Sequence, residues 1–522
     1  MNRTIFLSLC LGLVLLVAGC AVPPDPQTGP PDAEPLIRAE PAAGGNERAE
    51  AQSTGNLSLA DAVALALRKN ADLRVESLNS AMSAEDVKRS RAIYDPYVSA
   101  SVSGGGTTEA NRSGMNKNAG ASLAVTQQLS TGASISVSGQ TGFLVAREHE
   151  PGTPDFDYSS QVSVFITQPL LRNAGRQVTE VNIVLAKNSL QDALDRYRTF
   201  AADTVFSVVT TYNRLYALRQ SLESRKASLD AARQLLETTK ANAKAGTVRS
   251  IEVANAEYGV AFRLKDLVDA ERYVRDQEAS LRYLIGGEGK EEIIPSDPPT
   301  REEPQETEEQ ALQAALDLRP ELKQLRLALQ SSELQEQVSR NQTLPGVNLV
   351  VGGGLVGNNG TMGDNWQEMK DGQGWWSAGL QVTVPLGNTA AESDYRRSRI
   401  RGQQVRAQIA ALSWRIRNDV QSDLRALISA RLQIQVADKA LAQALQRLGE
   451  YRESNRAGAA TAQDVLNAEA DLSAARSTHI DAIDGYASAV MKLWHDTGEL
   501  LDQLGVKINT AKIENPPGTG EG

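Results

Sequence analysis

The sequence of 522 residues is poor in cysteine, histidine and aromatic residues. It contains two cysteines and three histidines, and Phe, Trp and Tyr make up 5% of the chain, whereas apolar residues make up 41%. This composition favours long helices packed through small side chains over one large globular core. The histidines (His149, His479 and His495) have no partner at metal-ligand spacing, so we expect no metal site and assign them to the surface or to packing.

The chain also lacks basic stretches and catalytic motifs. Its 54 basic and 64 acidic side chains give a formal net charge of −10, which argues against a nucleic-acid partner. The segment GGGLVG at Gly352–Gly357 has the spacing of a dinucleotide fingerprint, but it leads into NNGTMGDN instead of a helix. We find no nucleophile motif, paired catalytic carboxylates or phosphate loop, and therefore expect neither an enzyme nor a cofactor.

Only one long apolar run is present, and it lies at the N-terminus. Arg3 precedes the run from Ile5 to Ala18, which is too short to span a bilayer and is typical of a secretion signal. The following Gly19-Cys20 completes a segment that resembles the lipobox of bacterial lipoproteins. It predicts a signal peptide over residues 1–19 and lipid, palmitate included, on Cys20; the alternative is an ordinary signal with a chance cysteine.

Cys10 would leave with the signal, so Cys20 would be the single cysteine of the mature chain. This excludes an intrachain disulfide and a cysteine-based metal site. Ala21 rather than Asp follows, which by the bacterial sorting rule implies the outer membrane. Residues 20–56 are rich in Pro, Gly, Ala and acids and predict a disordered tether. No later segment is apolar enough for a membrane helix, so a membrane-spanning part must consist of strands.

The rest of the chain contains an internal duplication. AGTVRSIEVANAE begins at Ala245 and AGAATAQDVLNAE at Ala457, an offset of 212 residues. Two series of apolar residues spaced by seven precede these motifs at the same offset, and this spacing predicts two left-handed coiled-coil seams. The series are Val208, Leu215, Leu222, Leu229 and Leu236, and Val420, Leu427, Ile434, Leu441 and Leu448.

Earlier in each copy the offset is 249 residues. Leu73 corresponds to Leu322, and Pro96 to Pro345. The first copy therefore holds an insertion of 37 residues between Pro96 and its long helix. We divide the chain into a first repeat at 57–286, an equatorial linker at 287–307, a second repeat at 308–500 and a C-terminal tail at 501–522.

Alternating apolar and polar residues predict six strands. Two are expected in YVSASVSGG and SSQVSVFITQPL of the first copy, and two in PGVNLVVGGGLV and WWSAGLQVTVPLG of the second. The insertion, ASLAVTQQLSTGASISVSGQ, reads as two further strands joined by a tight turn at Ser130, Thr131 and Gly132. Long polar loops are expected at about 106–119 and 143–157.

Short turns at one end and long loops at the other are typical of an outer-membrane barrel. Aromatic residues near the strand ends fit an interfacial belt: Tyr94, Tyr97, Phe143, Phe156, Tyr158, Trp366, Trp375 and Trp376. Six strands are too few to close a pore, so several copies would have to share one barrel.

Helices account for most of the remaining length. Two of roughly 70 residues are expected at 176–245 and 389–457, each on the order of 100 Å long. Shorter helices are expected at 58–93, 251–286, 308–342 and 463–498, so two short helices end to end match one long helix. The predicted fold is mainly α with membrane β-strands: a long helical cylinder with strands at one end and the repeated motif at the other.

After residue 56, the chain resembles the TolC-like outer-membrane efflux proteins over nearly its whole length. The resemblance rests on the duplicated order of similar helix starts (LSLADAVALALRKNADLR and EEQALQAALDLRPELK), of Pro-Leu at strand ends (Pro169-Leu170 and Pro385-Leu386) and of two hairpin tips. It implies a homotrimer with a β-barrel shared between three protomers and an α-helical barrel of coiled-coil hairpins reaching into the periplasm.

The resemblance also implies a function. The trimer would be the passive channel of a tripartite efflux or secretion system, embedded in outer-membrane lipid and partnered by a periplasmic adaptor protein and an inner-membrane pump. The alternatives are a periplasmic coiled-coil adaptor or an envelope scaffold lipoprotein without channel activity. Members typically have two strands per half, or 12 per trimer; the insertion gives 18 or an extracellular hairpin on 12, and we favour 18.

The resemblance assigns a periplasmic tip or gate to Glu252, Asn255, Asp464 and Asn467. It assigns adaptor docking to Gly246, Thr247, Gly458 and Ala459. Some members carry two acids one turn apart; Asp464 matches the first but Asn467 replaces the second, so a weak electrostatic gate and no strong ionic latch are expected.

The residues themselves allow a simpler interpretation of the tip. Thr461 with Asp464 fits a capping box, and Glu252 lies in the first turn of a helix, where the helix dipole favours anions. Gly246 and Gly458 would end the long helices in the left-handed conformation. Capping and gating can hold together.

Overall fold

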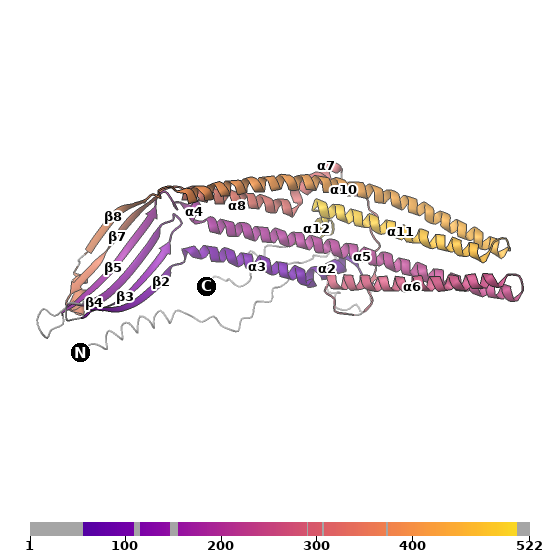
Figure 1. Cartoon of the computed structure of the whole chain (residues 1–522), viewed down its shortest axis with the longest axis horizontal. Helices are drawn as coiled ribbons and strands as arrows, with labels where there is room; N and C mark the ends of the chain where they lie inside the picture. The colour runs from indigo at the N-terminus through magenta and orange to yellow at the C-terminus, as the bar shows by residue number, and fades with distance from the viewer. Residues whose placement is uncertain are drawn as a thin grey trace.

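The computed structural model describes residues 56–108, 115–146, 155–289, 291–304, 307–371 and 374–508. Cys20, the signal and most of the tether lie outside the described residues. The molecule is elongated, with a sheet at one end and two helical hairpins at the other (Figure 1). Among the described helices, none is both long and apolar enough to cross a membrane.

The helices follow the predicted pattern closely. The long helices are α5 (Val181–Lys244), preceded by one turn, α4 (Arg176–Thr179), and α10 (Thr389–Arg456). With 64 and 68 residues, each is about 100 Å long. The shorter helices are α2 (Leu59–Lys69), α3 (Ala71–Arg91), α6 (Ser250–Leu284), α7 (Glu308–Leu318), α8 (Pro320–Gln342) and α11 (Ala462–Thr497); the short η1 (Ala92–Tyr94) and α12 (Leu500–Gln503) complete the helical part.

Six of the ten coiled-coil seam residues are buried and the other four are half-buried. Val208, Leu215 and Leu229 of α5 and Val420 of α10 are at most 2% exposed, as the spacing of seven predicts. In the hairpin region the helices pack in the order α10, α11, α5, α6, and nearer the sheet in the order α10, α8, α5, α3. The edges of this layer are therefore α10 on one side and α6 with α3 on the other (Figure 1).

Each predicted 58–93 and 308–342 helix is divided in two at an equivalent residue. Asn70 caps α3 by accepting a hydrogen bond from the amide of Leu73, and Arg319 stands before Pro320, the first residue of α8. Proline suits this first position because its missing N–H would have no helical partner. The offset of 249 residues between Asn70 and Arg319 extends the duplication to the joints.

The six strands form one antiparallel sheet in the order β2-β3-β4-β5-β7-β8. They are β2 (Tyr97–Thr108), β3 (Met115–Gln128), β4 (Ser134–Ala146), β5 (Asp155–Pro169), β7 (Gly346–Asn359) and β8 (Gly374–Thr383). The insertion supplies β3 and β4, which lie between β2 and β5. The strands extend into both predicted long loops, because main-chain pairing continues past the alternating pattern.

The sheet has one apolar and one polar face. One row across all six strands reads Val98, Val125, Val137, Val164, Gly353 and Trp376. The adjacent row, which points to the opposite face, reads Ser99, Ala124, Ser138, Ser163, Gly354 and Trp375. The side chains of the first row that extend beyond Cβ are exposed, from 37% for Val125 to 83% for Trp376.

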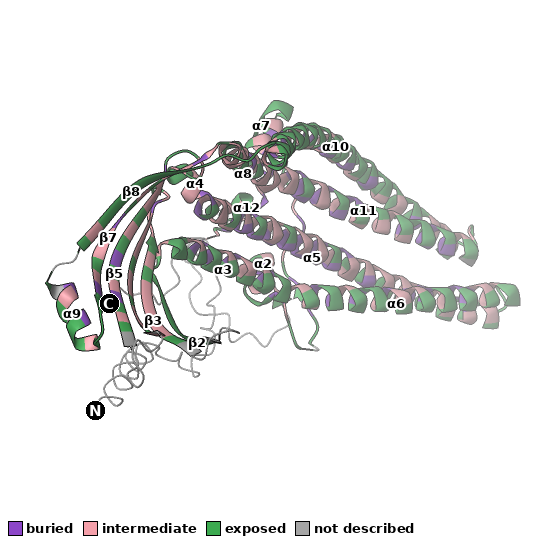
Figure 2. Cartoon of the chain, turned by 60° about the vertical axis from the view of Figure 1, so that its left-hand side comes forward, coloured by how far each residue is buried: buried purple, intermediate pink, exposed green. Residues whose placement is uncertain are grey.

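Three segments are more ordered than the sequence predicts. The expected loop after β7 contains α9 (Met362–Lys370), which packs on β7 and β5 at the end of the sheet remote from the hairpins (Figure 2). Within the linker, β6 (Ile294–Pro295) pairs in parallel with β1 (Asn56–Leu57). The start of the expected tail is also packed, with Val506 6% exposed in the main apolar cluster. These elements depend on contacts distant in sequence, which local patterns do not reveal.

Candidate functional site at the hairpin tips

The repeated motifs form the turns at the ends of the two hairpins. Gly246 and Gly458 both have φ of +75°, the left-handed conformation that closes helices, as predicted. The amide of Thr247 donates to the carbonyl of Asn242 at 3.0 Å, and the amide of Ala459 to that of Ser454 at 2.8 Å. No atom lies within 4 Å of a Cβ built on either glycine, so both tips present small, open surfaces.

The acids of the two tips have different surroundings. Asp464 forms the predicted capping box: its carboxylate accepts from the Thr461 amide at 2.9 Å, and the Thr461 hydroxyl accepts from the Asp464 amide at 3.2 Å. Hydrogen bonding to the Thr461 hydroxyl and amide lowers the pKa of Asp464 below its ordinary value. Capping therefore accounts for this carboxylate within one chain.

The first tip lacks this box, because Arg249 stands at the capping position and makes no side-chain cap. Glu252 lies in the first turn, and its Oε2 atom is enclosed without a hydrogen-bond partner. Asn467 accepts from Gln463 at 2.9 Å and is exposed, while Asn255 is half-buried. The four candidate gate residues thus lie within the first two turns of α6 and α11. Among the hydrogen bonds and ion pairs of the described residues, none joins one tip to the other through them.

A link between the hairpins lies slightly above the tips, where the sequence did not indicate one. Arg263 of α6 is 8% exposed and donates to the carbonyl of Leu466 of α11 at 3.1 Å. Gly259 makes room for this approach, because a Cβ there would lie 3.1 Å from Leu466 Cδ2. The sequence signal, a glycine four residues before an arginine within a helix, is too common to assign a contact.

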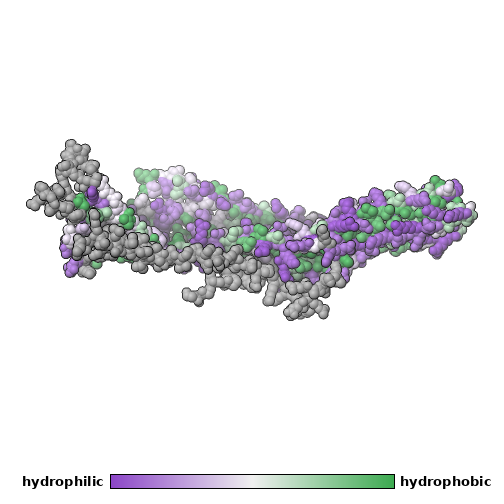
Figure 3. Space-filling model, turned by 90° about the horizontal axis from the view of Figure 1, so that it is seen from below, coloured by the Kyte–Doolittle hydropathy of each residue, from purple (hydrophilic) through white to green (hydrophobic). Residues whose placement is uncertain are grey.

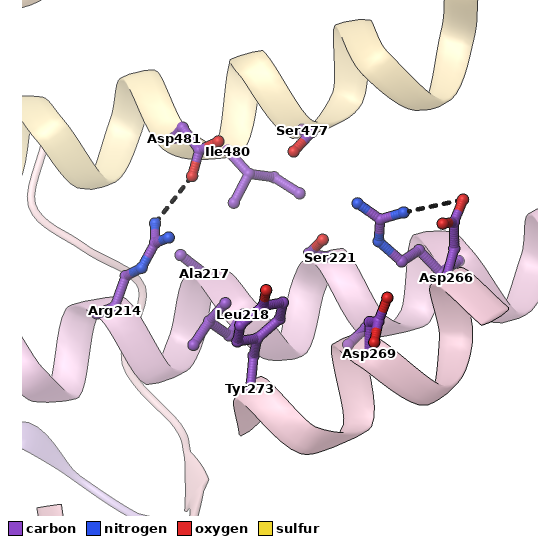
Figure 4. A pocket seen from close by; sticks show the side chains of 12 residues that line it. Arg214, Ala217, Leu218, Ser221, Asp266, Asp269, Tyr273, Ser477, Ile480 and Asp481 are labelled. Carbon is purple, nitrogen blue, oxygen red and sulfur yellow. Dashed lines mark hydrogen bonds and ion pairs between the residues drawn. The ribbon is translucent and has the colours of Figure 1, made fainter. Parts of the chain in front are cut away.

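Farther from the tips, a cavity of about 240 Å³ lies between α5, α6 and α11 (Figure 4). Arg214 bridges it by donating to Asp481 at 2.8 Å and to Asp484 at 3.3 Å. On its other side, Arg225 lies 3.5 Å from Asp266. Burial raises the pKa of Asp484, and Arg214 opposes this effect. The ion pairs of Arg214 across this cavity therefore join α5 of the first hairpin to α11 of the second.

A second charged cluster lies at the joint of the second repeat. His495 pairs through its two ring nitrogens with Asp203 at 2.7 Å and Asp496 at 2.8 Å. Burial favours the neutral ring, but these hydrogen bonds outweigh it and raise the pKa of His495 to about 9. His479 pairs with Asp438 at 2.8 Å. Both histidines are thus hydrogen-bonded to carboxylates within the chain, while His149 lies outside the described residues.

Comparison with known proteins gives these features a family context. Residues 311–499 match the family model described as "Outer membrane efflux protein". The chain is 25% identical over 366 residues to the outer membrane efflux protein BepC of Brucella suis biovar 1, covering 69% of this chain and 78% of BepC. The resemblance to the TolC-like outer membrane efflux proteins is thereby confirmed.

Solved structures of this fold agree over most of the chain. The outer membrane channel CmeC of Campylobacter jejuni has a TM-score of 0.62 at 15% identity, covering 85% of this chain and 86% of CmeC. The outer membrane protein VceC of Vibrio cholerae has a TM-score of 0.62 at 16% identity, covering 84% and 96%. The chain is therefore similar to the outer membrane efflux proteins, and over most of its length it has a mainly helical, TolC-like fold.

Proposed function

We propose that three copies of this chain assemble into an outer-membrane channel-tunnel, anchored by lipid on Cys20. It would be a passive conduit for substrates that a periplasmic adaptor and an inner-membrane pump deliver to the tips. The observation that carries the proposal is a pair of edges without a partner among the described residues, which run along the same two sides of the sheet and of the helical layer.

The sheet edges suit a head-to-tail ring. Six alternating strands give β2 and β8 opposite directions, so β8 of one copy can pair antiparallel with β2 of the next. Such a contact uses two different surfaces, which is the kind that closes rings. β8 leads into α10, and β2 follows α3, so the helical edges would meet together with the strand edges.

Both helical edges expose apolar side chains. On α10, Trp414 is 72% and Leu445 47% exposed; on the opposite edge, Leu78 of α3 is 45% and Phe262 of α6 50% exposed. Figure 3 shows apolar side chains among polar ones along the hairpin that is seen from below. Exposed residues of this size in rows are typical of an interface.

These residues also lie at similar distances from their own tip turns. At a rise of 1.5 Å per residue, Leu445 and Phe262 each lie about 18 Å from the tip turn of their own hairpin, measured toward the sheet. Trp414 lies about 65 Å up, and Leu78 about 64 Å up when α3 continues the line of α6. Each α10 residue can thus contact its counterpart on the next copy.

The continuous sheet supports 18 strands in a ring of three. Among the described strands, β2 pairs only with β3, and β5 only with β4 and β7. If β3 and β4 formed an extracellular hairpin, β2 would lose its partner in the sheet. The apolar face would meet lipid and the polar face would line the lumen.

At the tips, three copies would bring three Asp464 carboxylates and three Arg263–Leu466 links around one axis. Opening would be an iris-like shift of the hairpins that breaks these links. Gly246, Thr247, Gly458 and Ala459 would receive the adaptor, because they leave the tip surface small and open.

Cysteine cross-linking tests the assembly. In a variant with Leu78→Cys and Trp414→Cys, oxidation should produce covalent dimers and trimers in isolated membranes. Leu78→Cys with Ile428→Cys is the matched control, because Ile428 lies about 20 Å lower along the same helix. Equal cross-linking of both pairs, or none with the first, would contradict the ring and favour the scaffold or adaptor alternatives.

A further inference from the structure

The polar face of the sheet carries almost no charge. Within the described strands, the acidic and basic residues are Lys117, Asp155 and Asp157, all toward the end remote from the helices. Much of the polar face between this end and the helices is joined by neutral cross-strand hydrogen bonds. These are Ser101 with Ser122 at 2.8 Å, Thr126 with Ser136 at 3.3 Å, Ser138 with Ser163 at 2.9 Å and Gln140 with Gln161 at 2.9 Å.

Two large aromatic rings interrupt this hydroxyl and amide surface. Phe165 of β5 and Trp375 of β8 have ring centroids 5.6 Å apart and planes tilted by 46°. They reach toward each other across β7, which lies between their strands. Both side chains are half-buried, so part of each ring remains accessible from the polar face.

The glycine run of β7 explains how the rings fit. A Cβ on Gly352 would lie 2.5 Å from two ring carbons of Phe165, and one on Gly354 would lie 3.1 Å from Trp375 Nε1. The same atom on Gly354 would lie 2.2 Å from the carbonyl oxygen of Val162. The three glycines at 352–354 therefore form a stretch of backbone without side chains on which two aromatic rings rest, and the GGGLVG segment is not a phosphate loop.

We propose that Phe165 and Trp375 form a contact site for planar aromatic groups of solutes that cross the lumen. This inference rests on the proposed function, since it takes the polar face as the lumen wall. Two tilted rings offer a ring face and a ring edge to a third ring, which aromatic groups prefer over a parallel sandwich. Because the surrounding wall is neutral, the site selects on planarity and aromaticity and not on the sign of the solute's charge.

The site is suited to a solute that passes through the lumen without being retained. Conduction requires contacts that are weak and repeated, and three copies would place three equivalent sites at one height. A rigid apolar constriction would instead project both rings into the passage. The glycines prevent this by letting the rings lie against β7.

Fluorescence quenching of the purified full chain tests the site. A variant in which Trp366, Trp376, Trp414 and Trp494 are replaced by Phe keeps Trp375 as the single reporter. The probes are nicotinamide, N-methylnicotinamide cation and nicotinate anion, which are planar and aromatic with three different charges; acrylamide is the small non-aromatic control.

We expect saturable quenching by all three aromatic probes at concentrations that agree within about threefold. Phe165→Leu in the same background should weaken it at least about threefold and leave acrylamide quenching unchanged. Gly352→Ala, which displaces the Phe165 ring without removing it, should give the same loss and replaces Phe165→Leu if that variant does not fold.

Unsaturable quenching with the acrylamide pattern, or no effect of either substitution, would overturn the site. A strong preference for one charge would overturn the neutral-wall argument. The readout requires neither conduction nor cross-linking, so failure of this site and failure of the channel proposal are distinguishable.

Discussion

Asn70 and Arg319 occupy equivalent joints in the two halves of the chain. They make equivalent hydrogen bonds through different side-chain groups. The side-chain amide of Asn70 donates to the carbonyl of Leu284, the last residue of α6, at 3.1 Å. The guanidinium of Arg319 donates to the carbonyl of Asp496, at the corresponding end of α11. The first joint thus connects the break between α2 and α3 to the end of α6. The second connects the break between α7 and α8 to the end of α11.

Replacing either residue should loosen its own joint. Asn70→Ala removes a helix cap and a buried link, and we expect a loss of about 2 kcal/mol in unfolding free energy. Arg319→Ala should cost more, because it leaves the carboxylates of Asp419 and Asp496, 3.8 and 3.7 Å away, without this cation. Thermal unfolding in detergent measures both.

Asn70→Ser is the matched control for the first joint. It keeps a capping oxygen without adding a charge and loses the amide donor to Leu284, so its effect should lie between those of wild type and Asn70→Ala. An Asn70→Ala protein as stable as wild type would show that the joint is held by packing alone.

Stability should fall as the pH rises from about 6.5 to about 9. Hydrogen bonds to Asp203 and Asp496 raise the pKa of His495 from 6.5 to about 9, so the folded state binds this proton more tightly than the unfolded state. The contribution is complete below pH 6.5 and is lost through pH 9; the shift corresponds to an upper bound of about 3 kcal/mol.

The measurement is the midpoint of thermal unfolding at a series of pH values. His495→Gln should flatten the slope between pH 6.5 and 9 and lower the stability at pH 6.5. A slope that persists unchanged in His495→Gln would assign the pH dependence to other groups.

The sequence predicted the helices and strands well because each depends on local repetition. The seven-residue series in α5 and α10 and the alternation in β2 and β5 are visible without tertiary contacts, and the doubled motif at Gly246 and Gly458 located the two turns. The capping box at Thr461 followed from spacing alone.

The remaining features depend on partners distant in sequence. Arg263 finds Leu466 only when α6 and α11 pack side by side. The glycines at 352 and 354 form part of a dinucleotide-like motif, but the structure requires them for another purpose. They leave space for the side chains of Phe165 on β5 and Trp375 on β8. Helix α9 is short and forms where Gly357 of β7 allows its backbone to approach.

Gly357 should be indispensable for the packing of α9. A Cβ on Gly357 would lie 2.3 Å from the carbonyl oxygen of Asn365, which is itself fully buried. Gly357→Ala should therefore displace α9 or strain β7 and lower the unfolding temperature by several degrees. Gly379→Ala on β8 is the control, since no atom lies within 4 Å of its added Cβ. Equal stability of the two variants would contradict the close approach.

Thr461→Ala should weaken the start of α11 by about 1 kcal/mol through loss of the capping box. Thr461→Ser should retain most of it. Hydrogen exchange of the first turn of α11 measures this locally, and faster exchange is expected only in the alanine variant. If serine and alanine behave alike, the hydroxyl does not cap the helix.

Single-channel conductance in planar bilayers tests whether the assembled protein is a conduit that links near its tips hold closed. Arg263→Ala combined with Asp464→Asn should raise the conductance or the open fraction severalfold over wild type. Arg275→Ala, an exposed arginine on the same helix, should change neither. A purified protein that never conducts, even with both tip substitutions, would rule out the proposed channel.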